Sequence, residues 1–224
     1  MDKARIKAWD YLHLQDDIGA LSGCQYQDTI DSSFIADKLK PSDHVLEVGV
    51  GMGYVTKGLR DNAYIVSGFD IAPLALKRVR KYCEAIYNFD QIEDLPTNYF
   101  DIIICINMAQ HVPTSSLYYE LFHFIRSLKK TGIMTINCIM TDRMEDTGDD
   151  PDLVITDPRI GLKNNQLDSK GIGCFCRTKT YFEKMIDRCG GIATLIQNRP
   201  CGVWHITESY TYHITKKYKQ SLYE

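Results

Sequence analysis

The chain lacks the long apolar segments that place a protein across a membrane. None of its 224 residues belongs to an uninterrupted apolar run of about 18 residues, the length that a spanning helix needs. Residues 1–7 also lack the apolar core of a secretory signal peptide. We therefore expect a soluble, cytoplasmic protein that has no membrane partner.

The chain also lacks a surplus of positive charge. Its 26 lysines and arginines stand against 29 aspartates and glutamates, so the formal net charge is -3. A protein that follows a phosphate backbone normally carries a basic face, and the short basic run at 216–219 is typical of a solvated chain end. The composition therefore predicts no nucleic-acid partner and favours chemistry on a small molecule.

The eight cysteines include no Cys-x-x-Cys pair. That spacing marks many zinc and dithiol redox sites, so its absence argues against both. Several cysteines fall inside segments that we expect to be strands, which predicts reduced thiols with structural roles. The only close pair is Cys174 and Cys176, and no metal site is assigned to it.

What the chain does have is a strand followed directly by a glycine-rich turn. Residues 44–48 place apolar side chains around a single acid, Glu47, which predicts a buried parallel strand. Three glycines then follow at alternate positions: Gly49, Gly51 and Gly53. Glycine lets a ligand approach the backbone closely, so the segment predicts a nucleotide-type cofactor site, although a tight turn alone would also need glycine. The spacing differs from the G-x-G-x-x-G of dinucleotide folds, whose third glycine would fall on Tyr54 or Thr56.

A second acid follows the next apolar segment. Residues 63–70 predict a buried strand that ends in Asp70, about 20 residues after the glycine turn. An acid at that place lies beside the crevice of the first strand and accepts hydrogen bonds from a ribose diol. The alternative is an acid that caps the helix expected from Pro73, and the two roles are compatible. We assign Asp70 and the adjacent Ile71 to cofactor binding.

The strand and turn resemble the first motif of class I S-adenosylmethionine-dependent methyltransferases, an apolar strand that ends in E/D-x-G-x-G-x-G. Here the motif stands at residues 47–53. The resemblance extends over roughly residues 40–140 and implies an α/β fold with a doubly wound, Rossmann-like seven-stranded sheet, mostly parallel with an antiparallel last strand. It also implies S-adenosyl-L-methionine as the cofactor and methyl transfer to an O or N atom of a small polar metabolite.

The segment at 88–101 is similar to the family's passage from the third strand to the fourth, where a polar side chain holds the adenine amine. Counting back from Leu95, the expected acid falls on Gln91, while an acid lies one residue earlier at Asp90. The resemblance leaves the adenine contact open between these two residues. It makes Ile92 the apolar neighbour of the adenine ring.

Polar residues next appear at the end of the strand expected at 102–106. In open α/β sheets the ligand lies just outside the carboxyl ends of the strands. Asn107, Gln110 and His111 therefore fall where the methyl donor and the acceptor would meet, and Asn107 is assigned to the cofactor. An imidazole titrates near neutrality, so His111 is the candidate general base, with a packing role as its alternative.

The sequence predicts a single domain with four parts. They are an N-terminal helical lid at 1–40, a cofactor-binding core at 41–139, an acceptor-binding insertion at 140–176, and a C-terminal helix and strands at 177–224. Within them we expect helices at 54–61, 73–83, 116–129 and 178–189, and strands near 132–139, 192–198 and 203–215, the last two joined by a turn at 199–202. The acidic stretch at 142–157 leaves open a plain solvated loop or a divalent-metal site.

Two other functions stay open at this stage. A nicotinamide-dependent oxidoreductase would require the glycine turn to hold a diphosphate. A non-catalytic adenosylmethionine-binding partner protein would require no base at His111. Within the family, the chain lacks the N-P-P-Y-type element that marks amino-group methylation of bases and glutamine, and small enzymes of this appearance recur in bacterial surface-polysaccharide and secondary-metabolite biosynthesis.

Overall fold

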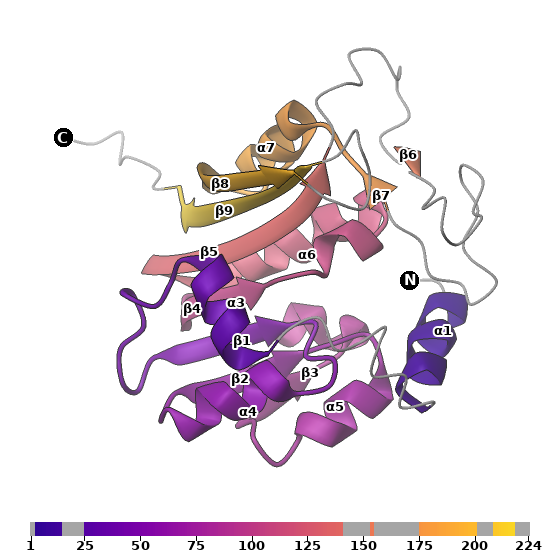
Figure 1. Ribbon diagram of the computed structural model, residues 1–224, viewed down its shortest axis with the longest axis vertical. Helices are drawn as coiled ribbons and strands as arrows, with labels where there is room; N and C mark the ends of the chain where they lie inside the picture. Colours follow the sequence, from indigo (N-terminus) through magenta and orange to yellow (C-terminus); the bar gives the residue numbers. More distant parts are fainter. Residues whose placement is uncertain (1–2, 15–24, 141–152, 155–174, 201–207, 218–224) are drawn as a thin grey trace.

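A seven-stranded sheet forms the centre of the computed structural model, which describes residues 3–14, 25–140, 153–154, 175–200 and 208–217 (Figure 1). The strands of the sheet are β1 (His44–Val48), β2 (Ile65–Phe69), β3 (Ala85–Tyr87), β4 (Phe100–Cys105), β5 (Leu128–Met140), β8 (Gly191–Pro200) and β9 (Glu208–Lys216). Their spatial order is β3-β2-β1-β4-β5-β9-β8. β9 runs antiparallel to both β5 and β8, and the pairs among β1 to β5 are parallel. The predicted sheet with its reversed last strand is confirmed.

Helices cover both faces of the sheet (Figure 1). The described helices are α1 (Lys3–Leu14), α3 (Tyr26–Ser33), α4 (Tyr54–Asp61), α5 (Pro73–Val79), α6 (Thr114–Ser127) and α7 (Lys179–Arg188). Two short 3-10 turns, η1 (Phe89–Asp94) and η2 (Ala109–His111), follow β3 and β4. The strands β6 (Leu153–Val154) and β7 (Phe175–Cys176) form a separate two-stranded sheet. Successive residues of each buried strand point to opposite faces. In β4, Ile103 packs in the core with α6 and α7, while Ile102 and Ile104 pack with α3 and α4. Because both faces are covered, β4 is apolar throughout its middle, as a central parallel strand requires.

The order of the strands reverses between β1 and β4. From β1 the chain builds outward through β2 to β3, and it then returns to add β4 on the other side of β1. The loops that follow β1 and β4 therefore leave the sheet in opposite directions and open a crevice at its carboxyl edge. The glycine turn lies in the first of these loops and His111 in the second.

Several predicted boundaries need correction. The helix predicted at 73–83 ends at Val79, where the chain turns so that the amide of Glu84 bonds to Val66 of β2. The helix predicted at 116–129 spans Thr114–Ser127, because Leu128 already pairs with β4. The strand expected near 132–139 therefore begins four residues earlier, and Gly132 lies inside β5 rather than at its start.

The turn predicted at 199–202 is wrong for its first two residues. Arg199 and Pro200 belong to β8, where they lie opposite Ser209 and Glu208 of β9. The next residues, 201–207, lie outside the described part of the chain. So does the predicted acidic stretch at 142–157 except for 153–154, along with most of the predicted insertion.

None of the helices that the structure describes combines the length and the apolar character needed to cross a bilayer. The cysteines whose side chains are described, Cys83, Cys105, Cys138 and Cys189, are free thiols.

Candidate functional site

The glycine turn adopts a backbone that only glycine accepts without strain. Gly49, Gly51 and Gly53 have φ values of +80°, +50° and +81°, which lie in the left-handed region. A Cβ atom on Gly53 would lie 2.8 Å from Val79 Cγ1, and one on Gly49 would lie 3.1 Å from Met108 Cγ. Around Gly51, in contrast, the nearest atom to such a Cβ is 3.9 Å away. Space is therefore left open directly above the middle glycine.

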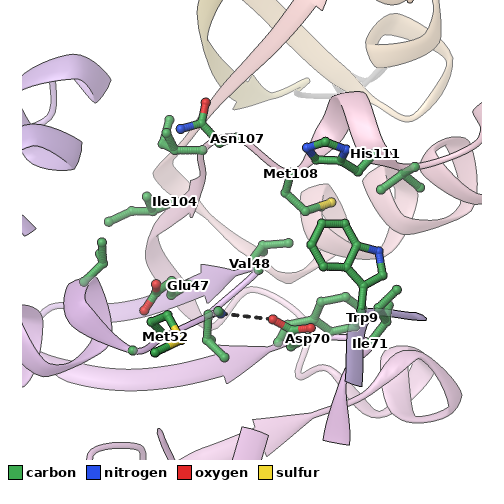
Figure 2. Close-up of a pocket in the computed structure, with 18 of the residues that line it drawn as sticks. Trp9, Glu47, Val48, Met52, Asp70, Ile71, Ile104, Asn107, Met108 and His111 are labelled. Atoms are coloured by element: carbon green, nitrogen blue, oxygen red, sulfur yellow. Dashed lines mark hydrogen bonds between the residues drawn. The ribbon is translucent and has the colours of Figure 1, made fainter. Parts of the chain in front are cut away.

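That open space belongs to a cavity of about 330 Å³ at the carboxyl edge of the sheet, within the size range of small-molecule sites. Eight residues predicted from the sequence line it: Glu47, Gly49, Gly51, Gly53, Asp70, Ile71, Asn107 and His111. Figure 2 shows Glu47 on one side of the cavity and Trp9 and His111 on the other. The fold thus brings together residues that are up to 64 positions apart in the predicted set.

Asp70 is buried beside the glycine turn and is anchored by backbone amides. Its Oδ2 accepts a hydrogen bond from the amide of Gly51 at 3.1 Å, and its Oδ1 accepts one from Ala72 at 2.9 Å (Figure 2). Burial raises the pKa of Asp70 to about 6, although these amide hydrogen bonds favour the charged form. The second bond is the capping interaction considered as the alternative role, so Asp70 holds the start of α5 and faces the cavity at once.

Glu47 is the second buried acid of the cavity. Its side chain is only 5% exposed, and its Oε2 accepts a hydrogen bond from Thr56 Oγ1 at 2.5 Å. Burial raises the pKa of Glu47 to about 8, and the negative charge of Asp70 adds to the shift. Since Thr56 lies in α4, this contact ties the end of β1 to the helix that follows the glycine turn.

The loop after β4 is held by a pair of asparagines. Asn107 has a φ of +58°, and its backbone amide donates to Asn137 Oδ1 at 2.7 Å. Asn137 Nδ2 in turn donates to Asn107 Oδ1 at 3.3 Å. Asparagine tolerates the left-handed conformation better than most residues, which explains why a polar residue directly follows the apolar strand. The sequence did not reveal the role of Asn137.

His111 lies at the end of η2, next to the N-terminal helix. Its ring packs edge-on against Trp9, with 5.4 Å between the ring centroids, and its carbonyl accepts a hydrogen bond from Arg5 Nη2 at 2.6 Å. The imidazole lines the cavity beside the residues of α1 that line it as well. His111 and the glycine turn therefore line the same cavity, as predicted. The chemical role of His111 stays a prediction.

The helix α1 supplies a wall of the cavity that sequence reasoning described only as a lid. Arg5, Trp9 and His13 line the cavity, and their spacing of four residues puts them on one helix face. Asp10 Oδ1 accepts a hydrogen bond from the amide of Leu74 at 3.0 Å, so α1 caps the first turn of α5. Arg78 of α5 lies 3.0 Å from His13 Nδ1. The spacing was visible in the sequence, but without the fold nothing showed which face turned inward.

The predicted adenine contacts do not line this cavity. Gln91 is engaged in a reciprocal pair with Asn88, whose side chain accepts from the Gln91 amide while Gln91 Oε1 accepts from the Asn88 amide. Ile92 is buried in the core that α6 and α7 share with the sheet, and Asp90 is exposed. The roles of these three residues remain predictions.

Two buried charges near the cavity escaped the sequence reasoning. Arg177 opens the predicted C-terminal part and had no assigned role, but it is 2% exposed and donates to the carbonyl groups of Ala109 and Val112 and to Thr114 Oγ1. It therefore fixes both ends of η2 and the start of α6. Glu120, on α6, lines the cavity and is buried as well. An acid between apolar residues of one helix face was the signal that could have identified it.

Comparison with protein families gives one match. Residues 45–132 match a family model described as a methyltransferase domain. The matched segment contains the glycine turn, Asp70, Asn107 and His111. Comparison with curated protein sequences gives no match.

Solved structures similar to this chain include two methyltransferases and one protein that is described as a dehydrogenase. A SAM-dependent methyltransferase from Methanosarcina mazei superposes with a TM-score of 0.61 at 14% identity, covering 83% of this chain and 98% of that one. The 1,6-didemethyltoxoflavin-N1-methyltransferase of Burkholderia thailandensis, solved with 1,6-didemethyltoxoflavin and S-adenosylhomocysteine, gives 0.62 at 15% identity, covering 95% and 89%. A Rhodobacter sphaeroides protein whose description proposes a zinc-dependent alcohol dehydrogenase gives 0.65 at 11% identity, covering 97% and 100%. At these identities the likeness shows the fold alone.

Proposed function

We propose that this chain, of which residues 45–132 match a methyltransferase domain, acts as a class I S-adenosylmethionine-dependent methyltransferase and transfers the methyl group to an oxygen or nitrogen atom of a small polar metabolite. One observation carries the choice of a small acceptor. The helix α1 lines one side of the cavity with Arg5, Trp9 and His13, and so narrows the space beside His111. A cavity of about 330 Å³ is of the size that takes small molecules, which supports a small acceptor rather than a polymer.

The residues present fit the cofactor. The space above Gly51 leaves its backbone accessible, and the Asp70 carboxylate provides acceptor oxygens for the two ribose hydroxyls at the wall of the cavity. We propose that Glu47, the three glycines, Asp70, Ile71 and Asn107 hold the cofactor, with Asp90 or Gln91 at its adenine amine and Ile92 against its adenine ring. When bound, S-adenosylmethionine supplies an activated methyl group, so the protein's main task is alignment of the acceptor.

On the acceptor side of the cavity, a base would remove the proton that the acceptor atom loses during methyl transfer. We assign His111 as the base that accepts a proton from the acceptor atom, because its ring lines the cavity beside Trp9. The pair of Asn107 and Asn137 fixes the loop that carries this residue. The Burkholderia neighbour is a 1,6-didemethyltoxoflavin-N1-methyltransferase solved with 1,6-didemethyltoxoflavin bound, which supports a small-molecule acceptor here. Surface-polysaccharide or secondary-metabolite biosynthesis is the context that we propose by analogy.

The size of the acceptor is tested with a labelled methyl group. We expect purified protein, incubated with methyl-labelled S-adenosylmethionine and a fractionated cell extract, to label compounds below ~1 kDa and to leave nucleic acid and protein fractions unlabelled. Liquid scintillation of each fraction, followed by mass spectrometry of the labelled one, is the measurement. Label found only in a macromolecular fraction would contradict the proposed small acceptor.

The ribose assignment of Asp70 is tested by binding alone. In Asp70→Ala the ribose hydroxyls lose their acceptor and the amides of Gly51 and Ala72 lose theirs, so S-adenosylhomocysteine should bind roughly ten- to a hundredfold more weakly by calorimetry. Affinity of the unaltered protein should fall as the pH drops below about 6, where Asp70 becomes protonated, and Asp70→Asn should remove that dependence.

Asp101→Ala is the matched control for Asp70→Ala. Asp101 also accepts a hydrogen bond from a backbone amide, that of His44 at 3.0 Å, but it lies at the opposite end of β1 and outside the cavity. Its removal should lower stability and leave the affinity unchanged. Equal losses of affinity in the two variants would show that the effect of Asp70 is structural.

A further inference from the structure

His111 is the last residue of a turn that is only three residues long. Its amide donates to the Met108 carbonyl at 2.8 Å, and the next amide, that of Val112, donates to Ala109 at 3.3 Å. The hydrogen bonds of a 3-10 turn have poor geometry, so a turn this short is weakly held by its own bonds. The ring of His111 therefore keeps one position only if other parts of the protein hold η2.

Arg177 holds this turn at both of its ends. Its Nη1 donates to the Ala109 carbonyl at 3.2 Å, and its Nη2 donates to the Val112 carbonyl. Its Nε donates to Thr114 Oγ1 at 3.0 Å, at the start of α6. Because a guanidinium group is planar and rigid, its three nitrogens fix these three oxygens relative to one another. The backbone of His111 lies between the two carbonyl groups and is fixed with them.

A second arginine binds a third carbonyl group of the same stretch. Arg5 of α1 donates to the carbonyl of His111 at 2.6 Å, and the His111 ring packs edge-on against Trp9 of the same helix. The two arginines stand before and after the cofactor-binding core in the sequence. Two distant parts of the chain thus meet on the one turn that presents His111 to the cavity.

Arg177 is a costly residue for binding carbonyl groups. It is 2% exposed, and each hydrogen bond described for it ends on a neutral oxygen. An arginine keeps its charge, so burial removes the hydration of a full charge. The charge of Glu120, a buried acid of α6, offsets part of this loss. An amide side chain donates to carbonyl groups without such a loss, and what the guanidinium adds is its rigid fork.

We propose that Arg177 is a positioning residue for the reaction, which fixes η2 so that the His111 ring reaches the acceptor atom. This inference rests on the proposed function, in which His111 accepts the proton. Arg177 does not line the cavity, so it acts through the turn rather than by contact with a ligand. A base must lie within hydrogen-bond reach of the proton that it removes. A displacement of about 1 Å costs up to roughly a hundredfold in rate.

The rates of two variants test the proposal. Arg177→Lys keeps the charge and loses the fork, whereas Arg177→Met loses both. With the acceptor identified by methyl labelling, kcat per folded molecule should fall roughly tenfold in Arg177→Lys and roughly a hundredfold in Arg177→Met. The acceptor KM and the affinity for S-adenosylhomocysteine should change less than about threefold. In a His111→Asn background Arg177→Lys should cost no further rate, because both changes remove the same function.

The position of the His111 ring is measured by NMR, without an acceptor. In protein with ring-labelled histidine and saturated with S-adenosylhomocysteine, the His111 resonance is the one that His111→Asn removes. Trp9→Leu then gives its position without the ring-current shift of the indole. At about pH 8.5, where an imidazole is uncharged, Arg177→Lys should move the resonance toward that position. Thr114→Val, which removes only the partner of Nε, should move it less and in the same direction, and it serves if Arg177→Lys does not fold.

Lys216→Met is the matched control for loss of a cation that binds backbone. Lys216 donates to the carbonyl groups of Arg126 and Leu128 at the start of β5, outside the cavity. It should lower stability and leave the rate and the resonance unchanged. An unmoved resonance, an unchanged kcat in the Arg177 variants, a further loss in the His111→Asn background, or equal effects of Lys216→Met overturns the proposal. The small-acceptor function fails on a different result, the transfer of label to macromolecules, so the two failures are distinguishable.

Discussion

A Gly51→Val variant should bind S-adenosylhomocysteine at least ~100-fold more weakly than the unaltered protein while remaining folded. Gly51 has a φ of +50°, a conformation that a β-branched residue adopts only under strain. A Cβ atom itself would meet nothing closer than 3.9 Å, so the two methyl groups of valine would extend into the space that the cofactor needs. Calorimetric titration measures the loss, and circular dichroism with thermal unfolding checks the fold.

Two other glycines separate exclusion of the ligand from damage to the backbone. Gly190 has a φ of +82° and no atom within 4 Å of a Cβ, so Gly190→Val carries the same kind of strain away from the cavity. Gly132→Ala would bring a Cβ atom within 2.8 Å of the Phe100 carbonyl of β4. Both variants should lose stability and keep their affinity for the cofactor. If Gly190→Val binds S-adenosylhomocysteine as poorly as Gly51→Val, strain rather than exclusion governs the effect.

Replacing His111 with asparagine should lower turnover by ~10²–10⁴-fold, the usual contribution of a general base. Cofactor affinity and melting temperature should stay nearly unchanged, because the substitution keeps the backbone carbonyl to which Arg5 of α1 donates and removes only the edge-on ring contact with Trp9. The pH–rate profile of the unaltered protein should rise through the range near neutrality, where an imidazole loses its proton and becomes able to accept another. The variant should lack that rise. Initial rates with the acceptor identified by methyl labelling provide the measurement.

His123→Asn gives the corresponding control on α6. This histidine is buried and packs edge-on against Tyr119, with 4.6 Å between the ring centroids, and it does not line the cavity. Its replacement should affect stability and leave the rate per folded molecule intact. If His111→Asn behaves in the same way and loses more than ~2 kcal/mol of stability, His111 is a packing residue and the base lies elsewhere.

The sheet and the part of the cavity around the glycine turn could be predicted because their signals are local. Buried parallel strands are continuous apolar runs, and a glycine turn or an acid at a strand end marks the carboxyl edge wherever the sheet is assembled. Gly51 and Asp70 were found in this way, and the structure joins them by one hydrogen bond. The end of α5 at Val79 and the start of β5 at Leu128 could not be predicted from the sequence. They depend on hydrogen bonding to β2 and β4 rather than on local sequence.

The buried charged residues near His111 could not be predicted, for the opposite reason. Arg5, Glu120 and Arg177 come from three distant segments, and none of them follows a motif. Each is a charged residue in an ordinary position until the fold buries it, and burial is decided by packing across the whole domain. The sequence alone also could not show that Gln91 would be engaged with Asn88.

The hydrogen bond between Asp10 and the amide of Leu74 gives the N-terminal helix a thermodynamic role. The amide of Ala72, two residues earlier, is bound by Asp70, so α1 and the acid of the cavity hold the same turn. A ligand that contacts Trp9 or Arg5 binds more tightly when α1 is docked than when it is detached. By linkage, the free energy with which that ligand favours the docked helix equals the free energy with which docking favours the ligand. A change far from the reacting atoms that lowers the docked fraction of α1 therefore weakens binding, without altering a single group that touches the ligand.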